Sequence, residues 1–279
     1  MNIPGDSIRL ISFNILYDYG ADKPYSWQSR RENIFSLLRF HAPDVFCLQE
    51  PLQNQVEDLA DYFNDYSHIT AGCSDGVSEG QHMTTFFLKD KFEMLEHGKF
   101  GLSEKPEKLG FVGWDAKNPR LALWVKLFQR STTNCFCVIN THLDHIGENA
   151  RQQSALLIGR RAADISNDLP ILLCGDFNAN NDSQTYRNIK DSGFIDCADI
   201  PTALNYNQPY SYHRFYLEEE IDRYLEEYKD DPRVLKVIDH IFFKGAVRVL
   251  RHGILGDNYA GIYPSDHFPK ICDLLLEAH

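Results

Sequence analysis

The residues of this chain that could do chemistry stand where its predicted strands end. The apolar run 171–174 predicts a buried strand, which stops at Gly175 and is followed by Asp176 and Asn178. A strand end holds such side chains rigidly, and the loop beyond it leaves them open to a substrate. A carboxylate there can take a proton from water. We therefore expect this stretch to hold an attacking water and the phosphate that the water attacks.

Five other strand ends carry polar groups. One such group at the end of a strand is ordinary, but six on one chain, each bordering an apolar run, favour a shared site. Besides Asp176 with Asn178, they are Asn14, Glu50, the run Thr141-His142-Leu143-Asp144-His145, the pair Asp239-His240 and the run Ser265-Asp266-His267.

The carboxylate of Glu50 indicates a cation. It follows the apolar run 44–49, and a buried carboxylate needs a partner or a bound ion. Mg²⁺ prefers oxygen ligands, and Glu50 with the amide oxygen of Asn14 would suit it. Zinc fits less well, because the pair His142-x-x-His145 lacks the earlier histidine of two-zinc hydrolases. No cysteine is placed to complete a tetrahedral set either.

The composition limits the partners. The chain has 279 residues with 28 lysines and arginines against 40 acids, a net charge of −12. Such a charge disfavours tight, sequence-independent binding to long nucleic acid. Seven cysteines, an odd number without a CxxC pair, indicate a reducing compartment. We find no signal peptide and no apolar stretch of about 18 residues, so we expect a cytoplasmic protein without a membrane span. No obligate protein partner is evident.

The elements that must position these residues are mostly strands. Strands are predicted at 8–13, 44–49, 84–88, 92–100, 120–128, 135–140, 171–174, 234–243, 247–255 and 270–275. Helices are predicted at 28–41, after Pro51, at 149–165 and at 183–192, with helical spacing also in the acidic run 217–231. Hairpin and crossover connections together favour a mixed-sheet α/β sandwich. No linker divides the chain, so we expect one domain over residues 1–279.

The motifs FN, LQE, NTHLDH, GDFNA, IDHIFF and SDHFP, in this order, resemble the endonuclease/exonuclease/phosphatase superfamily. The likeness runs from Ser12 to Pro269. The segment 113–116 with Arg120 and Trp124, and the segment 142–151, resemble a bacterial-type branch. The resemblance implies a four-layer α/β/β/α sandwich of two packed mixed sheets. It also implies hydrolysis of a phosphate ester with Mg²⁺ or Mn²⁺.

The resemblance also implies roles for single residues. Asp176 resembles the residue that orients or deprotonates water, and Asn178 the amide that holds water or a phosphate oxygen. His267 resembles the histidine that contacts the scissile phosphate, supported by Asp239, and His142 a second such histidine. The expected metal ligands are Glu50, Asn14 and Asp266.

The roles agree with the chemistry. A charged histidine offsets the negative charge of the transition state, and a carboxylate partner favours that charged form. Arg120 can grip two phosphate oxygens at once, although a surface arginine at a strand start is an equal alternative.

Three functions stay open at this point. The first is a phosphodiesterase acting on nucleic acid or on a small phosphodiester, which is our leading hypothesis. The second is a phosphomonoesterase or a phosphatase of lipid headgroups such as inositol phosphates or sphingomyelin. The third is a catalytically silent binding module of the same fold, against which the intact set of acids and histidines argues.

Overall fold

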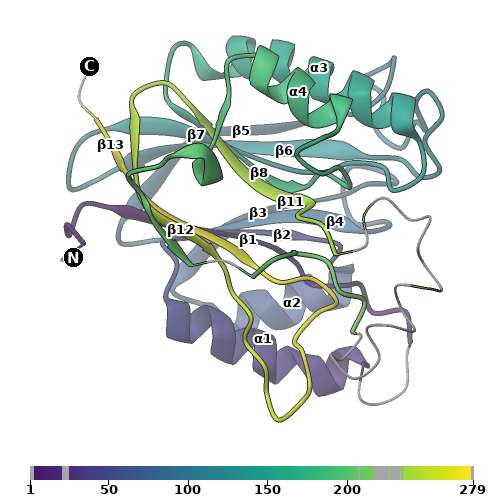
Figure 1. Cartoon of the computed structure of the whole chain (residues 1–279), viewed down its shortest axis with the longest axis horizontal. Coiled ribbons are helices and arrows are strands. Elements are labelled where there is room, and N and C mark those ends of the chain that lie inside the picture. Colours follow the sequence, from purple (N-terminus) through teal and green to yellow (C-terminus); the bar gives the residue numbers. More distant parts are fainter. Residues whose placement is uncertain are drawn as a thin grey trace.

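Two mixed β-sheets lie face to face, and helices cover the outer face of each (Figure 1). The computed structural model describes residues 3–20, 25–206, 208–215, 226, 233 and 235–277. The four-layer α/β/β/α sandwich expected from the sequence is confirmed. None of the helices in these residues is both long and apolar enough to cross a membrane.

The first sheet holds the N-terminal and C-terminal strands. In the described residues its order is β10-β12-β13-β1-β2-β4-β3. Its strands are β1 (Ile8–Asn14), β2 (Val45–Gln49), β3 (Tyr66–Gly72), β4 (His82–Leu88), β10 (Leu204–Tyr206), β12 (Val247–Ile254) and β13 (Lys270–Leu276). Helices α1 (Trp27–His41) and α2 (Gln53–Tyr62) cover its outer face (Figure 1). The Ser26 side chain caps α1, and Ala42 ends it in the left-handed region.

The second sheet holds the middle of the chain. Its order among the described residues is β5-β6-β7-β8-β11-β9. Its strands are β5 (Phe92–Gly101), β6 (Leu121–Gln129), β7 (Cys135–His142), β8 (Ile171–Asp176), β9 (Ile195–Asp196) and β11 (Asp239–Lys244). Helices α3 (Glu148–Ser166) and α4 (Gln184–Asp191) cover it, and a short 3-10 helix spans Cys197–Asp199.

A polar clasp joins the two sheets near one edge. The Gln49 side chain at the end of β2 donates to Asn140 Oδ1 on β7 at 2.7 Å. The Asn140 amide in turn donates to the carbonyl oxygens of Leu48 and Thr84, each at 3.0 Å. These side chains are buried, and their hydrogen bonds across the interface fix the relative position of the packed layers. The clasp therefore aligns the strand ends that follow it.

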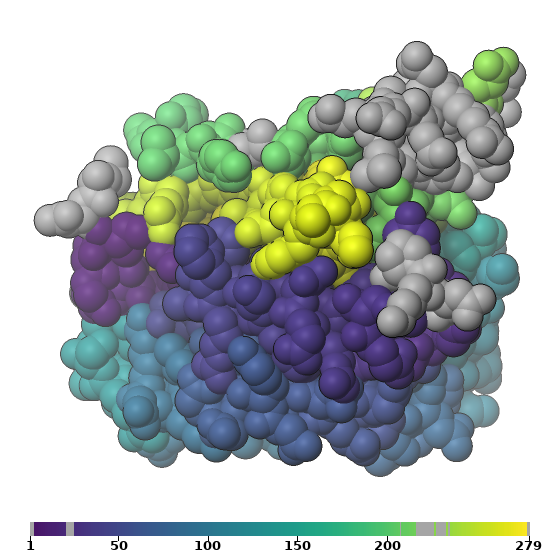
Figure 2. Space-filling view, turned by 90° about the horizontal axis from the view of Figure 1, so that it is seen from below, coloured from purple at the N-terminus to yellow at the C-terminus, as the bar shows by residue number. Residues whose placement is uncertain are grey.

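Helix α1 carries a second long-range link through a buried side chain. Figure 2 shows α1 (purple to blue) with the loop between β12 and β13 (yellow) lying against it. Buried Arg30 on α1 donates to the carbonyl oxygen of Pro264 at 2.8 Å and to that of Ile15 at 2.7 Å. Arg30 thereby holds the segment before Asp266 close to the end of β1.

Most predicted elements agree with the structure, but the short strands β9 and β10 were not predicted, and three further points need comment. The predicted strand 234–243 was too long at its start, because β11 begins at Asp239. The sequence reasoning missed β3, whose half-exposed pattern of buried and polar residues weakens the strand signal. The helical spacing at 217–231 lies outside the described residues, apart from residue 226.

Gly175 shows why the motif before Asp176 needs a glycine. Its φ of +148° lies in a region that favours glycine, and a Cβ there would overlap the carbonyl oxygen of Thr141 on β7. We expect Gly175→Ala to lower the free energy of unfolding by roughly 3 kcal/mol, measured by denaturant melts. Gly5→Ala is the matched control, because nothing lies within 4 Å of a Cβ there. Equal stability of the two variants would contradict this reading of the strand packing.

Candidate active site

Strand register brings the predicted residues of the second sheet side by side. β7 and β8 are parallel, and His142 pairs with Asp176. β8 and β11 are antiparallel, and Asp176 pairs with Asp239. In the first sheet β1 and β2 are parallel, with Asn14 opposite Gln49, directly before Glu50. Because the clasp aligns the two sheets, all these strand ends meet at one rim.

A buried histidine–carboxylate pair forms one side of this rim. His267 Nδ1 lies 2.9 Å from Asp239 Oδ2, which also accepts a hydrogen bond from the Ser211 hydroxyl at 2.6 Å. Burial alone would lower the pKa of His267, but the charges of Asp239 and Asp176 outweigh it and raise the pKa to about 10. His267 is therefore an imidazolium at neutral pH.

Asp176 lies at the centre of the site. Its Oδ2 accepts from the Asn14 amide at 3.1 Å and lies 3.7 Å from His267 Nε2 and 3.3 Å from His142 Nε2. Burial, together with the charge of Asp239, raises the pKa of Asp176 to about 6. A carboxylate with such a pKa is mostly ionised at neutral pH yet remains basic enough to accept a proton.

Asn178 is held in a strained position beside Asp176. Its φ of +47° is unusual for a residue with a side chain. Its backbone N–H donates to Asp176 Oδ1 at 2.8 Å, and its side-chain amide donates to the carbonyl oxygen of Leu143 and faces His142 Nε2, both at 3.0 Å. Arg233 in turn donates to its Oδ1 at 3.1 Å. The amide is thus fixed on all sides.

Glu50 and Asp266 together form an acidic wall of the cavity. Glu50 has a φ of +74°, and one oxygen accepts from the backbone N–H of Tyr17 at 3.3 Å. The other oxygen lies 3.8 Å from His142 Nδ1, beyond hydrogen-bond distance. Burial, and next the charge of Asp266, raise the pKa of Glu50 to about 7. Two carboxylates that repel each other in one cavity are the kind of oxygen-donor pair that a hard divalent cation prefers.

A second group of residues also has metal-ligand spacing. The ligand atoms of Asp176, Asp239 and His267 all lie within 4.8 Å of one another and could hold a metal ion. However, Asp239 Oδ2 already accepts from Ser211 and faces the His267 ring nitrogen. A metal there would have to displace these hydrogen bonds. Asp239 Oδ1 has no hydrogen-bond partner among the described residues, but Asp239 lies behind the cavity lining. Glu50 and Asp266 repel each other and line the cavity itself, so they fit a cation better.

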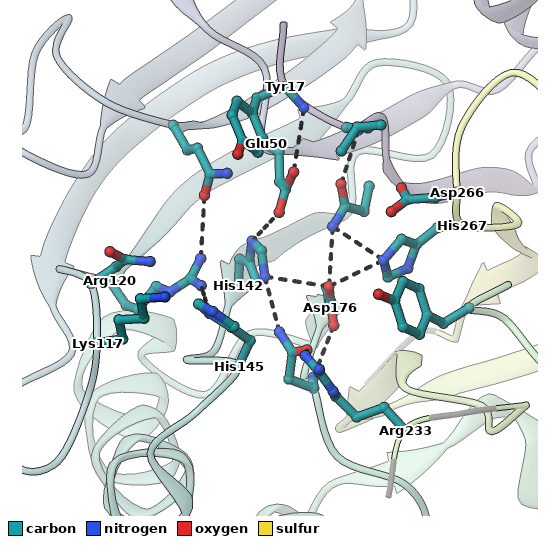
Figure 3. A pocket seen from close by; sticks show the side chains of 16 residues that line it. Tyr17, Glu50, Lys117, Arg120, His142, His145, Asp176, Arg233, Asp266 and His267 are labelled. Atoms are coloured by element: carbon teal, nitrogen blue, oxygen red, sulfur yellow. Dashed lines mark hydrogen bonds and ion pairs between the residues drawn. The ribbon is translucent and has the colours of Figure 1, made fainter. Parts of the chain in front are cut away.

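Basic side chains form the opposite wall of the cavity. Figure 3 shows Arg120, Lys117 and His145 on one side of His142, with Asp176 and His267 on the other. The acidic and basic walls enclose a cavity of about 400 Å³. Arg120 and Lys117 thus lie apart from the carboxylates, whereas His267 and Arg233 lie on the same side as Asp176.

The structure brings the predicted site residues together. Asn14, Glu50, Arg120, His142, Asp176, Asn178, Asp266 and His267 line this one cavity, and Asp239 lies behind His267. The amide nitrogen of Asn14 faces Asp176, and its oxygen accepts from the Leu16 N–H, so its role as a metal ligand stays a prediction.

Sequence reasoning missed several residues of the site. Ser211 sits in the loop after β10, and no signal in the sequence marks it. Arg233 lies between the acidic run 217–231 and the predicted strand 234–243, and the sequence assigned it no role. The other residues of the cavity lining that the sequence did not single out are Leu16, Gln81, Lys117 and Asn118.

A buried ion pair supports the loop that carries Asn178. His240 Nδ1 lies 3.0 Å from Asp196 Oδ2, and its Nε2 lies 3.0 Å from the carbonyl oxygen of Ala179. The ring thus links the Asp196 carboxylate to the backbone of the loop through its two nitrogens. Burial would raise the pKa of Asp196, but His240 and Lys270 hold it below its usual value. The stabilisation from Asp196 is present above the usual pKa of an aspartate and is lost as the pH falls.

Removing this pair should cost stability. We expect His240→Gln to lower the free energy of unfolding by about 3 kcal/mol, because it leaves the buried Asp196 carboxylate without its imidazole partner. The half-exposed pair of His41 with Asp257, at 3.3 Å, provides the control. His41→Gln should cost less than about 1 kcal/mol. Urea melts at neutral pH compare the two variants. Equal losses of unfolding free energy would show that the buried pair stabilises the protein no more than the half-exposed one.

Comparisons with known proteins agree with this geometry. The profile of the Endonuclease/Exonuclease/phosphatase family matches residues 11–267. An endonuclease/exonuclease/phosphatase from Bacteroides vulgatus is 34% identical, with a TM-score of 0.86 over 97% of this chain and 99% of that chain. A mannosyl-6-phosphatase from Bacteroides thetaiotaomicron is 30% identical, with a TM-score of 0.84 over 96% of this chain and 100% of that chain.

A curated relative is longer than this chain. Nocturnin from Drosophila melanogaster is 24% identical over 98% of this chain, but the chain spans 47% of the length of that protein. The family match, the two full-length structural relatives and the convergence of the motifs at one rim agree. The chain belongs to the Endonuclease/Exonuclease/phosphatase family.

Proposed function

We propose that this chain is a phosphoric ester hydrolase that works with a divalent cation, Mg²⁺ or Mn²⁺. One observation carries the proposal: Asp176, the acidic wall of Glu50 and Asp266, and the charged His267 all line a single cavity. A base, a cation site and a countercharge are the parts that water attack on a phosphate ester requires. Family membership supports the same reaction class.

Each residue has a task in this reaction. The bound cation would offset phosphate charge and lower the pKa of water, and Glu50 and Asp266 would hold it. Asp176 takes the proton from the attacking water. The Asn178 amide, fixed by its own contacts, orients the water or a phosphate oxygen. The His267 imidazolium, held by Asp239, donates to a phosphate oxygen as negative charge develops there.

Two substrate classes remain. A phosphomonoester of a small molecule is supported by the 30% identical relative that is a mannosyl-6-phosphatase, and a cavity of about 400 Å³ suits a compact substrate. A phosphodiester, including a nucleic acid, is supported by the Tyr17 and Tyr19 rings. These rings are 37% and 52% exposed with centroids 5.6 Å apart, and Tyr17 lines the cavity, so both could stack on a base.

Parallel assays test the proposal. The purified protein with Mg²⁺ or Mn²⁺ is offered a hexose 6-phosphate, an inositol phosphate, a sphingomyelin analogue and a single-stranded oligonucleotide, each with and without a chelator. We expect turnover of at least one ester, abolished by the chelator. If none is hydrolysed and calorimetry finds no divalent-ion binding, the chain is a silent binding module and the proposal fails.

A further inference from the structure

Arg120 is a buried cation in the wall of the cavity. Its side chain is 5% exposed, and it stands directly before β6. Asp144 lies behind it, 3.6 Å from its Nε, and this Nε has no hydrogen-bond partner among the described residues. A buried guanidinium with unused donors is costly unless an anion completes its contacts.

The surroundings of Arg120 leave its charge directed to the cavity. The Asp144 carboxylate accepts three backbone N–H groups, from Asn118, Ile146 and Gly147, so its charge is already shared. The outer nitrogens of Arg120 make two contacts, at 3.5 Å with Gln81 Oε1 and at 3.2 Å with His145 Nδ1.

Lys117 adds a second positive charge beside Arg120, and the contacts of Arg120 leave some of its own N–H donors available to a ligand. Burial and the charge of Arg120 lower the pKa of His145, which is therefore neutral and accepts that contact. Exposed Lys117 adds a second cation to the wall. A guanidinium has five N–H donors, so donors remain for a ligand.

Arg120 and the reaction centre act on the same space. The positive charge of Arg120 acts to lower the pKa of Glu50, against the larger effect of burial, and it helps to lower the pKa of His142. Figure 3 shows Arg120 across His142 from Asp176 and His267. A phosphate between the two walls would therefore meet the cation site and His267 on one side and Arg120 on the other.

We propose that Arg120, with Lys117 beside it, binds the third terminal oxygen of a phosphomonoester and so selects monoesters over diesters. The inference rests on the proposed phosphoesterase function and names its substrate class. A monoester carries two charges on three terminal oxygens, whereas a diester carries one charge on two. The contacts with Gln81 and His145 leave an N–H on each outer nitrogen of Arg120, and these can donate to that extra oxygen.

A diester would leave this wall unsatisfied. It would place an ester oxygen and its carbon against Arg120, which then loses a charge-assisted partner in a buried position. Sites built to hydrogen-bond a substrate group strongly reject analogues that lack it, because buried donors are then left unpaired. Arg120 thus favours monoesters in two ways. It binds the oxygen that only a monoester offers, and its own N–H donors lose a partner when a diester is bound.

The test compares two esters with the same leaving group. The probes are para-nitrophenyl phosphate and bis(para-nitrophenyl) phosphate, with Mg²⁺, for the wild type, Arg120→Gln, Arg120→Lys and Lys117→Gln. Arg120→Gln should lower kcat/KM for the monoester by about 100-fold and for the diester by less than about 10-fold. Arg120→Lys should recover part of the loss. Arg248→Gln, an exposed arginine on β12, is the matched control and should change neither rate.

The outcomes separate the inference from the proposed function. Equal losses on both esters, or a wild type that prefers the diester, would overturn the inference while leaving a phosphoesterase. No turnover of either ester or of any substrate in the parallel assays, together with no divalent-ion binding, would defeat the proposed function itself. Because buried Arg120 variants can lose stability, melting curves accompany the rates. The exposed Lys117→Gln variant then tests the basic wall without a folding risk: an unchanged monoester-to-diester ratio in it counts against the inference.

Discussion

Asp176→Asn should lower kcat/KM by about 1,000-fold while the protein stays folded. The substitution keeps the size of the side chain but removes the base that takes the proton from water. In the described structure, Asp176 Oδ2 is approached by Asn14, His142 and His267. None of these side chains is a second carboxylate that could take over as the base. Steady-state rates with saturating Mg²⁺ measure the effect.

Stability provides the control for this variant. The pKa of Asp176 is raised to about 6 in the folded protein, which means that its ionised form is disfavoured there. Removing the charge at pH 7 should leave the melting temperature unchanged or raise it. Asp191→Asn, an exposed acid at the end of α4, should keep full activity. Near-normal turnover by a folded Asp176→Asn protein would show that Asp176 is not the base.

Glu50→Gln should raise the Mg²⁺ concentration needed for half-maximal activity by about 10-fold or more. The variant removes a carboxylate charge from the acidic wall but keeps one oxygen. An exposed acid on α2 offers the control, since Glu57→Gln should not alter metal dependence. Mg²⁺ titrations of the rate compare the two variants.

Stability without substrate gives this prediction a second readout. The pKa of Glu50 rises from 4.5 to about 7 on folding, so the wild type loses stability as the pH rises through this range. Without metal at pH 8, Glu50→Gln should therefore be at least as stable as the wild type. Mg²⁺ should raise the melting temperature of the wild type more than that of the variant, because it binds only the folded state. Equal shifts would make Glu50 a structural residue.

The sequence predicted the parts of the site that lie on strands. Glu50 and Asp176 each follow an apolar run that must be buried, and a strand fixes its last side chain in a known direction. Strand alternation and helix caps likewise predicted most of the sandwich. These signals are local, which is why they survive in one sequence without any coordinates.

The supporting contacts could not be predicted in the same way. The Ser211 hydroxyl meets Asp239 from 28 residues away, and Gln49 meets Asn140 from 91 residues away. Such pairs depend on how loops and sheets pack, and no spacing rule relates them. The sequence singled out Arg120 and His145 but not Lys117, nor that the three form one wall. They come together only after the loop before β6 and the loop after β7 have folded against each other.

The most direct test of the central claim is a calorimetric titration of Mg²⁺ into the wild type, with and without saturating inorganic phosphate. If the acidic wall holds the cation, and the cation, His267 and Arg120 together hold one phosphate, each ligand must strengthen the binding of the other. We predict that phosphate lowers the Kd for Mg²⁺ by at least about 5-fold, and that Glu50→Gln abolishes this coupling. Mg²⁺ binding that ignores phosphate, or that persists unchanged in Glu50→Gln, would contradict a single shared site.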